Sequence, residues 1–406
     1  MKTVGIIAEF NPFHNGHKYL IDTVRNLTSA DYVVIIMSGA FTQRGTPAWM
    51  HKYDRTRIAL NCGADCIIEL PTSYSTATAE TFAYGAVTLL DSLKCIDYLA
   101  FGSECGDIDV LSRVADELLN PTDEYKNRLA LELSKGLSFP LARANAMKSY
   151  KDILNQPNNI LGIEYIKALK TIQSSITPIT ISRKGNGYHD LTNSTLPSSA
   201  TIRNMTLQNE DSDPVASLQD MVPSKALEIM HRYINLGETI SINDFDDIIH
   251  HSLLCSDVQK LSNIQDINLD LANRIINNLP EYTDISSFIL KLKTKELTYT
   301  RISRSVIHIL LNMTDLTHNA DGQLVSCPYA KILGFKKQSQ PIMHQISLCS
   351  KLPLITKSAD ASKLMDADAY RVFEATIRAD RIYNIVSNKK AHTHHNDEYK
   401  LSPVIL

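Results

Sequence analysis

The 406-residue sequence lacks several features that would define whole classes of protein. No apolar run approaches the roughly 18 residues of a membrane-spanning helix, which argues against an integral membrane protein. The first residues lead at once into a strand pattern, so we expect no signal peptide. The 7 cysteines are odd in number and have no framework spacing, which favours a reducing compartment over a disulfide-bonded secreted scaffold. These absences predict a soluble globular protein of the cytoplasm.

Positively charged residues are scarce in the middle of the chain and abundant at its end. Residues 205–285 carry 4 Lys and Arg against 14 Asp and Glu, whereas residues 286–406 carry 17 against 10. A basic region beside a nucleotide-binding core is typical of a polyanionic partner such as RNA. A merely solvated basic surface is the alternative.

Short apolar runs alternate with helical patterns over the first hundred residues. Strands are expected at 4–8, 32–37, 66–70 and 96–101, and helices at 17–27, 52–62 and 79–93. This alternation predicts an α/β fold with a Rossmann-like parallel sheet that is covered by helices on both faces. A fifth strand is expected at 176–181, after a helical insertion at about 107–170.

We therefore predict two domains. The first covers residues 1–208 and contains the sheet, and residues 209–215 form a linker because the run NEDSD precedes Pro214. Residues 216–406 are predicted to form a mainly α-helical C-terminal domain and a candidate RNA-binding region. Its helices are expected at 224–233, 246–254, 268–278, 300–313 and 367–387.

The most specific motif is an H-x-G-H turn, from His14 to His17, between the first strand and the first helix. Parallel sheets bind ligands beyond the carboxyl ends of their strands, where helix N-termini favour phosphate. Two imidazoles there can donate hydrogen bonds to phosphate oxygens and stabilise a pentavalent transition state. Histidines in a turn are more often structural, but this position favours the chemistry of ATP.

A second motif, SSATIR from Ser198 to Arg203, follows a strand and a loop and enters a helix. Its hydroxyl and N–H groups can hold phosphates, and Arg203 can neutralise their charge. An ordinary helix start is the alternative for the motif taken alone. Its pairing with the H-x-G-H turn upstream favours an ATP site.

The two motifs resemble those of the H-x-G-H nucleotidylyltransferase superfamily, whose members have a HUP-type domain. Further blocks resemble the bacterial tRNA(Met) cytidine acetate ligase family. They are GIIAEFNPFHNGH, SGAFTQRGTPA, FAYGAV, FGSECGDI, QPNNILGIEYIKAL and SRKGNGYHD. The resemblance is dense over residues 1–205 and thinner at 301–312 and 329–337.

The resemblance implies an ATP-dependent ligase. Acetate and ATP, with Mg²⁺ expected beside the ATP, would form acetyl-adenylate and pyrophosphate. The acetyl group would pass to N4 of the wobble cytidine (position 34) of elongator tRNA(Met), giving N4-acetylcytidine. Two alternatives stay open: a small-molecule nucleotidylyltransferase of the same superfamily, and an ATP-sensing RNA-binding protein without turnover.

The resemblance and the two motifs together predict the site residues. The catalytic residues are His14 and His17. ATP contacts are predicted for Ile7, Ala8, Glu9, Phe10, Asn11, Pro12, Phe13, His14, Asn15, Gly16, His17, Lys18, Tyr19, Leu20, Gly102, Asn159, Arg183, Ser199 and Arg203. RNA contacts are predicted for Lys184, Arg301, Arg304, Lys336 and Lys337. No metal site made by protein side chains alone is expected.

One position departs from the family pattern. The chain has Ala40 where the family more often carries Asn or His. An alanine cannot donate a side-chain hydrogen bond to a reacting acyl phosphate, so this position bears on catalysis. Two carboxylates, Glu9 and Glu104, could contact the ribose or Mg²⁺.

Overall fold

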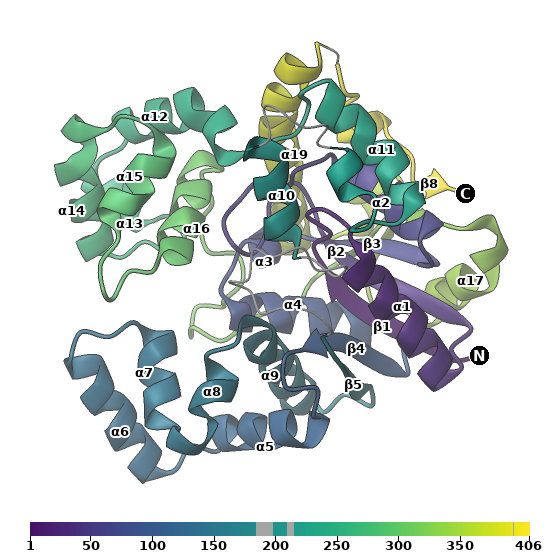
Figure 1. The fold of residues 1–406 in the computed structure, drawn as a ribbon, viewed down its shortest axis with the longest axis horizontal. Coiled ribbons are helices and arrows are strands. Elements are labelled where there is room, and N and C mark those ends of the chain that lie inside the picture. Colours follow the sequence, from purple (N-terminus) through teal and green to yellow (C-terminus); the bar gives the residue numbers. More distant parts are fainter. Residues whose placement is uncertain (184–197, 209–214, 393) are drawn as a thin grey trace.

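A computed structural model describes residues 1–183, 198–208, 215–392 and 394–406. At the centre of the described chain lies an 8-stranded sheet with the order β5-β4-β1-β2-β3-β6-β7, in which β8 pairs with β6. The strands are β1 (Thr3–Ala8), β2 (Tyr32–Ser38), β3 (Cys66–Leu70), β4 (Tyr98–Ser103), β5 (Thr177–Ser182), β6 (Ala330–Phe335), β7 (Leu354–Ile355) and β8 (Val404–Ile405). Strands β1 to β5 pair in parallel with one another, which confirms the predicted α/β sheet (Figure 1).

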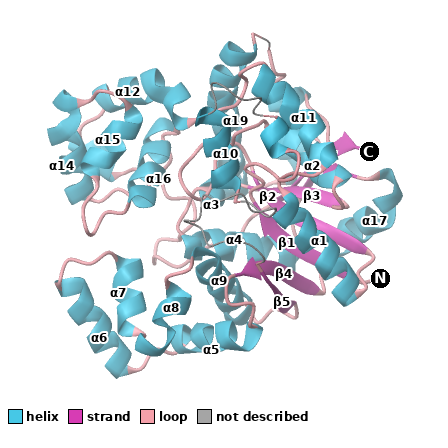
Figure 2. Cartoon of the chain, in the orientation of Figure 1, coloured by secondary structure: helices cyan, strands magenta, loops and turns pink. Residues whose placement is uncertain are grey.

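Alternate residues of the central strands point to opposite faces of the sheet. In β2, Val33 and Ile35 belong to one hydrophobic core, whereas Val34 and Ile36 belong to another. The helices that complete the two cores are α1 (Asn15–Thr28) and α2 (Lys52–Asn61) on one face, and α4 (Ala79–Ser92) and α9 (Pro157–Thr171) on the other. Figure 2 shows the strands in magenta among the cyan helices that pack against the sheet. Burial on both faces explains why these strands are continuously apolar.

The predicted insertion is helical, and side-chain caps start its longer helices. Its helices are α5 (Ile108–Leu119), α6 (Asp123–Ser134), α7 (Phe139–Ala146) and α8 (Lys151–Leu154), and they lead into α9. Asp107 accepts hydrogen bonds from the first turn of α5, and Thr122 accepts one from Tyr125 N at 3.2 Å. Such caps satisfy N–H groups that have no partner inside a helix.

The C-terminal part begins with helices close to the predicted ranges. The helices after β5 are α10 (Ser199–Gln208), α11 (Ser224–Asn235), α12 (Asp246–Leu254), α13 (Val258–Ser262), α14 (Leu269–Asn278), α15 (Ile285–Leu292), α16 (Tyr299–Leu310), α17 (Gln340–Cys349), α18 (Ala361–Leu364) and α19 (Ala367–Ala391). Helices α12 to α16 enclose a third hydrophobic core, which includes Phe245 and Phe288. In Figure 1 they form the group at the upper left, above the insertion helices.

The last third of the chain returns to the sheet, although a mainly helical region was expected there. β6 runs antiparallel to β3, with Lys331 opposite Glu69, and β7 and β8 extend the sheet beyond it. This pairing joins segments far apart in the sequence, so the local pattern did not reveal it. The predicted linker lies almost wholly outside the described residues, and the domain boundary there stays a prediction.

The helix lengths and the cysteines bear on two of the predictions from the sequence. In the described part of the chain, no helix is long and apolar enough to cross a bilayer. All seven cysteines have free thiols. Cys62 and Cys66 are buried, and burial raises the pKa of the Cys62 thiol to about 11. Both thiols therefore behave as apolar core groups.

Candidate active site

A cavity of about 1050 Å³ lies at the carboxyl ends of β1 and β4. The chain runs outward from β1 to β2 in one direction and from β4 to β5 in the other, so the strand order reverses between β1 and β4. Doubly wound sheets bind ligands at such a switch point. The wall also includes residues of α7 and α9 and of the segment that begins α16. The sheet, the insertion and the C-terminal helices therefore share one cavity.

The H-x-G-H turn begins α1 and is held by a reciprocal cap. The Nδ1 atom of His14 accepts a hydrogen bond from Gly16 N at 3.1 Å, and His17 Nδ1 accepts one from His14 N at 3.2 Å. The two rings stack with their centroids 3.7 Å apart and 24° between their planes. A Cβ atom at Gly16 would lie 2.9 Å from the His14 ring, so this position needs glycine. The capping geometry thus positions both histidines.

Each histidine can present an N–H donor to the cavity. Because both Nδ1 atoms accept hydrogen bonds, the proton of each neutral imidazole lies on Nε2. Burial, assisted by the positive charge of Arg183, lowers the pKa of His14 to about 3. Burial and the neighbouring His14 and Arg183 hold the pKa of His17 well below 6.5. Neutral donors of this kind can stabilise a developing phosphate charge without taking up a proton.

We expect that neither imidazole titrates between about pH 5 and 8 in the folded protein. Both rings would stay neutral in the fold and protonate only on unfolding, so their burial lowers stability as the pH falls below 6.5. The test is a pH titration of the ring Cε1–Hε1 NMR signals in ¹³C-histidine-labelled protein, assigned with His14→Asn and His17→Gln variants. A midpoint near pH 6.5 for either ring would contradict the buried, neutral state.

The second motif holds the segment that precedes the histidines. Ser199 Oγ donates to Pro12 O at 3.0 Å, and Arg203 Nη1 donates to the Asn11 carbonyl. Asn11 Oδ1 also accepts a hydrogen bond from Trp49 N at 2.7 Å. The SSATIR helix start therefore contacts the segment that leads into the H-x-G-H turn, which brings the two motifs together at the cavity.

A buried arginine of α2 fixes the loop after β2. Arg55 is fully buried and donates to the carbonyl of Glu9 at 2.7 Å, to that of Ser38 at 3.0 Å and to that of Gly39. The next residue, Ala40, is 4% exposed and packs in the third hydrophobic core. It is not among the described residues that line the cavity. The methyl group of Ala40 therefore fills a core position and does not face the cavity.

The ends of β4 and β5 form another part of the cavity wall. Arg183 packs over Gly102, and both residues line the cavity. Asn159 is 1% exposed and faces the loop after β4, where its Oδ1 accepts from Glu104 N at 3.0 Å and from Cys105 N at 3.1 Å. Asn159 N donates in turn to Glu104 Oε2 at 2.8 Å. Asn159 thus organises this loop, and its ATP contact stays a prediction.

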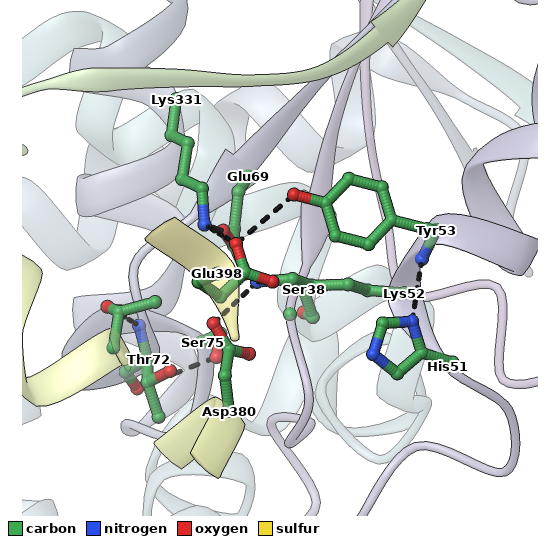
Figure 3. Close-up of polar contacts among 12 residues, drawn as sticks. Ser38, His51, Lys52, Tyr53, Glu69, Thr72, Ser75, Lys331, Asp380 and Glu398 are labelled. Atoms are coloured by element: carbon green, nitrogen blue, oxygen red, sulfur yellow. Dashed lines mark hydrogen bonds and ion pairs between the residues drawn. The ribbon is translucent and has the colours of Figure 1, made fainter. Parts of the chain in front are cut away.

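Five buried charged side chains, which we call the ionic core, lie behind the loop after β2. They are Lys52, Glu69, Lys331, Asp380 and Glu398 (Figure 3). Lys52 Nζ lies 2.8 Å from Glu69, 2.6 Å from Asp380 and 3.0 Å from Glu398. Lys331 Nζ lies 3.0 Å from Glu69 and 2.5 Å from Glu398. A Cβ atom at Gly39 would collide with Glu69, so the ionic core directly supports the loop that borders the cavity.

Comparison with known proteins agrees with this geometry. The family model described as HIGH Nucleotidyl Transferase matches residues 1–398. The tRNA(Met) cytidine acetate ligase of Caldanaerobacter subterraneus subsp. tengcongensis is 40% identical over 394 residues, or 95% of each chain. The enzyme of the same name from Acetivibrio thermocellus is 34% identical over the whole of both chains. This chain belongs to the tRNA(Met) cytidine acetate ligase family.

Solved structures agree with the assignment to this family. Thermotoga maritima TmcAL bound with alpha-thio ATP superposes with a TM-score of 0.89 at 29% identity, and both chains are covered completely. The apo form of the same protein gives a TM-score of 0.91 at 30% identity, again over both whole chains. The similarity therefore extends through the C-terminal helices and the strands that follow them.

Most of the residues predicted to contact ATP line the cavity of this family member. Those that do are Ile7, Ala8, Glu9, Phe10, Asn11, His14, His17, Leu20, Gly102, Arg183, Ser199 and Arg203. Those that do not are Pro12, Phe13, Asn15, Gly16, Lys18, Tyr19 and Asn159. Phe13 is fully buried in the core below α1, and Lys18 pairs with Asp22 at 2.8 Å on the outer face of that helix. The second group can support the site without facing the cavity.

The structure separates the predicted RNA contacts. Arg301 and Arg304 of α16 line the cavity, and Arg304 is bound to Asp266 at 3.1 Å. Lys336 and Lys337 follow β6, beside the start of β3, because Lys336 N donates to Asp65 O at 3.1 Å. β6 is antiparallel to β3, so these lysines lie at the opposite edge of the sheet from the cavity. Lys184 lies outside the described residues.

Several residues that line the cavity were not predicted from the sequence, and Tyr165 and Arg143 are two of them. Tyr165 of α9 and Arg143 of α7 line the cavity and are 4% and 8% exposed. Tyr165 lies one helical turn beyond Leu161, which also lines the cavity, so a 3.6-residue period was the available signal. That period alone predicts a buried core tyrosine, because it does not show where a cavity opens.

Proposed function

We propose that this protein is an ATP-dependent ligase that joins acetate to N4 of the wobble cytidine of elongator tRNA(Met). The observation that carries this proposal is the stacked His14–His17 pair, whose Nε2–H donors lie in a cavity also lined by Arg183 and Arg203. The names of the close relatives supply the substrates. We further propose that the enzyme works in the cytoplasm, where its tRNA substrate would be found.

In the first step, a carboxylate oxygen of acetate attacks the α-phosphorus of ATP. The bond between that phosphorus and the bridging oxygen breaks, and pyrophosphate leaves with the electron pair. Negative charge grows on the α-phosphate oxygens, where the two imidazole N–H groups can stabilise it. The guanidinium groups of Arg183 and Arg203 supply positive charge for the phosphates. The product of this step is acetyl-adenylate.

Mg²⁺ is proposed to accompany ATP. Among the residues that the structure describes, no three His, Cys, Asp or Glu side chains converge on a point that could hold a metal ion. We propose that phosphate oxygens and water supply most of the ligands of Mg²⁺. In this proposal His14, His17, Arg183 and Arg203 position the phosphates.

The test uses labelled acetate, ATP and unmodified tRNA(Met), followed by digestion of the RNA and mass spectrometry of its nucleosides. We expect N4-acetylcytidine at the wobble position and acetate-dependent exchange of pyrophosphate into ATP. A tRNA(Met) with uridine at the wobble position is the control and should yield no acetylated nucleoside. Pyrophosphate release that needs a phosphorylated small molecule instead would favour the small-molecule nucleotidylyltransferase. Salt-sensitive tRNA binding without turnover would favour the ATP sensor.

A charge substitution tests which predicted basic residues contact tRNA. Arg301 lines the cavity, and no acidic side chain in the described chain pairs with it, so we propose that it contacts the RNA backbone. Arg301→Gln should weaken tRNA binding about tenfold. It should also reduce the slope of the logarithm of the association constant against the logarithm of salt concentration by about 1. Lys337→Gln, at the opposite edge of the sheet, is the matched control and should leave both unchanged. An equal loss in both variants would refute a tRNA path along the cavity.

A further inference from the structure

Two polar side chains in the cavity have hydrogen-bonding capacity that no other described residue uses. Ile7 packs into the core beneath α4 and α9, and Glu9, two residues further on, continues toward the same side of β1. Glu9 and Tyr165 of α9 both line the cavity. They lie on the side of β1 away from α1, whose first turn carries the histidine pair. This part of the cavity is available to a second reactant.

Glu9 has one fixed and one open carboxylate oxygen. Its Oε1 accepts a hydrogen bond from Gln43 N at 2.7 Å, and its backbone carbonyl is held by Arg55 at 2.7 Å. Within the described residues, Oε2 has neither a hydrogen bond nor an ion pair. The main chain and one oxygen of Glu9 are thus fixed, while the second oxygen is free to accept a proton or an N–H group.

The other carboxylates that the described residues place in or near the cavity are already paired or exposed. They are Glu80, Glu104, Glu164, Asp266 and Glu296. Glu104 accepts three hydrogen bonds from the start of α9, and Glu164 pairs with Arg143 at 2.6 Å. Asp266 pairs with Arg304 at 3.1 Å. Glu80 and Glu296 are exposed to solvent. The pattern singles out Glu9 as the partly buried carboxylate with a free oxygen.

Tyr165 is a buried phenol without a hydrogen-bond partner in the described part of the protein. It is 4% exposed, and its ring packs against Phe101 with the centroids 5.6 Å apart. A buried tyrosine hydroxyl normally finds a partner, so an unpartnered one that faces a cavity indicates a ligand. Burial, together with the negative charge of Glu9, raises the pKa of this phenol, which therefore stays protonated. Its hydroxyl can act as a donor.

We propose that Glu9 and Tyr165 recognise the amine-bearing edge of cytosine, with the Glu9 carboxylate accepting from N4–H and the Tyr165 hydroxyl donating to N3. This inference rests on the proposed function and names the residues that select its nucleobase. Cytosine offers a donor at N4 and an acceptor at N3, which match a carboxylate and a hydroxyl. Uracil would place its O4 carbonyl against the carboxylate, so two acceptors would face each other.

The same contact gives Glu9 a part in acetyl transfer. The lone pair of N4 is delocalised into the cytosine ring, so the amine is a weak nucleophile until a proton is drawn from it. As N4 attacks the carbonyl carbon of acetyl-adenylate, the new C–N bond forms. The bond from that carbon to the phosphate oxygen breaks, and AMP leaves with the electron pair. Glu9 Oε2 takes the proton released from N4 and later passes it to water.

The decisive experiment measures the two half-reactions separately in the full-length protein. Glu9→Gln keeps an acceptor for Gln43 N but replaces the free oxygen with an N–H donor. We expect acetyl transfer to tRNA(Met) to fall by about 100-fold or more, and by at least about tenfold more than acetate-dependent pyrophosphate exchange, which a contact of Glu9 with ATP would also lower. Tyr165→Phe should lower transfer by about tenfold and leave exchange near the wild-type rate. Tyr84→Phe, on α4 and outside the cavity wall, is the matched control and should change neither.

A base analogue tests the N3 contact directly. A tRNA(Met) with 3-deazacytidine at the wobble position lacks the N3 acceptor, so wild-type protein should acetylate it about tenfold more slowly. Tyr165→Phe should show no further loss with this tRNA, because the contact is already absent. Additive losses, or parallel losses of exchange and transfer in Glu9→Gln, would overturn the proposal. If wild-type protein shows no acetate-dependent exchange, the proposed function itself fails, which is a separate result.

Discussion

His17→Gln is expected to lower acetate-dependent pyrophosphate exchange about 100- to 1000-fold, the usual cost of removing a donor to a transition-state oxyanion. The substitution is chosen to preserve the fold. Glutamine at the third position of a helix can still accept the hydrogen bond from the N-cap backbone, which His17 Nδ1 now accepts at 3.2 Å. His14→Asn is the companion variant, because asparagine is a favourable N-cap and keeps the acceptor for Gly16 N.

Measured stability separates catalysis from folding in these two variants. We expect the free energy of unfolding to change by less than about 1 kcal/mol in each, since the cap is retained. ATP binding, measured with a nonhydrolysable analogue, should weaken far less than the exchange rate falls, because the donors act mainly on the transition state. If exchange stays within about threefold of wild type in both variants, the histidine pair is a structural cap only.

Lys52→Met is expected to be the most destabilising single substitution considered, at about 3 to 5 kcal/mol, because it leaves buried carboxylates without their cation. Lys52 is 2% exposed and lies within 3.0 Å of Glu69, Asp380 and Glu398. Removing it leaves Asp380 without its ion-pair partner, while Glu69 and Glu398 share the single ammonium group of Lys331. Urea denaturation at pH 7 measures the loss.

An exposed ion pair is the matched control for Lys52→Met. Lys18 pairs with Asp22 at 2.8 Å on the surface of α1, with both side chains at least 42% exposed. Lys18→Met should therefore change stability by less than about 1 kcal/mol. A loss below about 1 kcal/mol in Lys52→Met itself would show that the ionic core is solvated or protonated in solution.

The pH dependence of the ionic core follows from Asp380. Burial raises the pKa of Asp380 to about 7 from an ordinary 3.8. The positive charge of Lys52 opposes this rise, whereas the negative charges of Glu69 and Glu398 add to it. Between these values the folded protein holds a proton that the unfolded chain releases. The contribution of Asp380 to stability is thus present at low pH and lost as the pH rises through 7. In Asp380→Asn this part of the pH dependence should disappear.

Local patterns in the sequence were sufficient for the parallel part of the fold. The strand predicted at 66–70 coincides with β3, and the helix predicted at 246–254 coincides with α12. These elements follow from short-range causes: a continuous apolar run in the strand and a 3.6-residue period in the helix. The H-x-G-H turn was predictable for the same reason, because its cap involves residues only three apart.

Contacts between distant segments decided the rest. β6 is a strand because it pairs with the edge of β3, and Lys331 is buried there because Glu69 and Glu398 neutralise it. Ala40 could not be interpreted from the sequence either, because the direction of its methyl group depends on the C-terminal helices that pack over it. A lysine in a basic third of the chain gives no local sign of being buried.

By itself, the sequence determined the α/β sheet, the histidine turn with its partner motif and the family, because each depends on residues close together in the chain. Only the tertiary structure decided which predicted residues face the cavity. It placed Arg301 in the cavity wall and Lys337 at the opposite sheet edge, and it showed that no other described residue pairs with the Glu9 Oε2 atom or the Tyr165 hydroxyl. The physical reason is that burial and pairing of a side chain are set by neighbours from distant segments, which packing alone brings together.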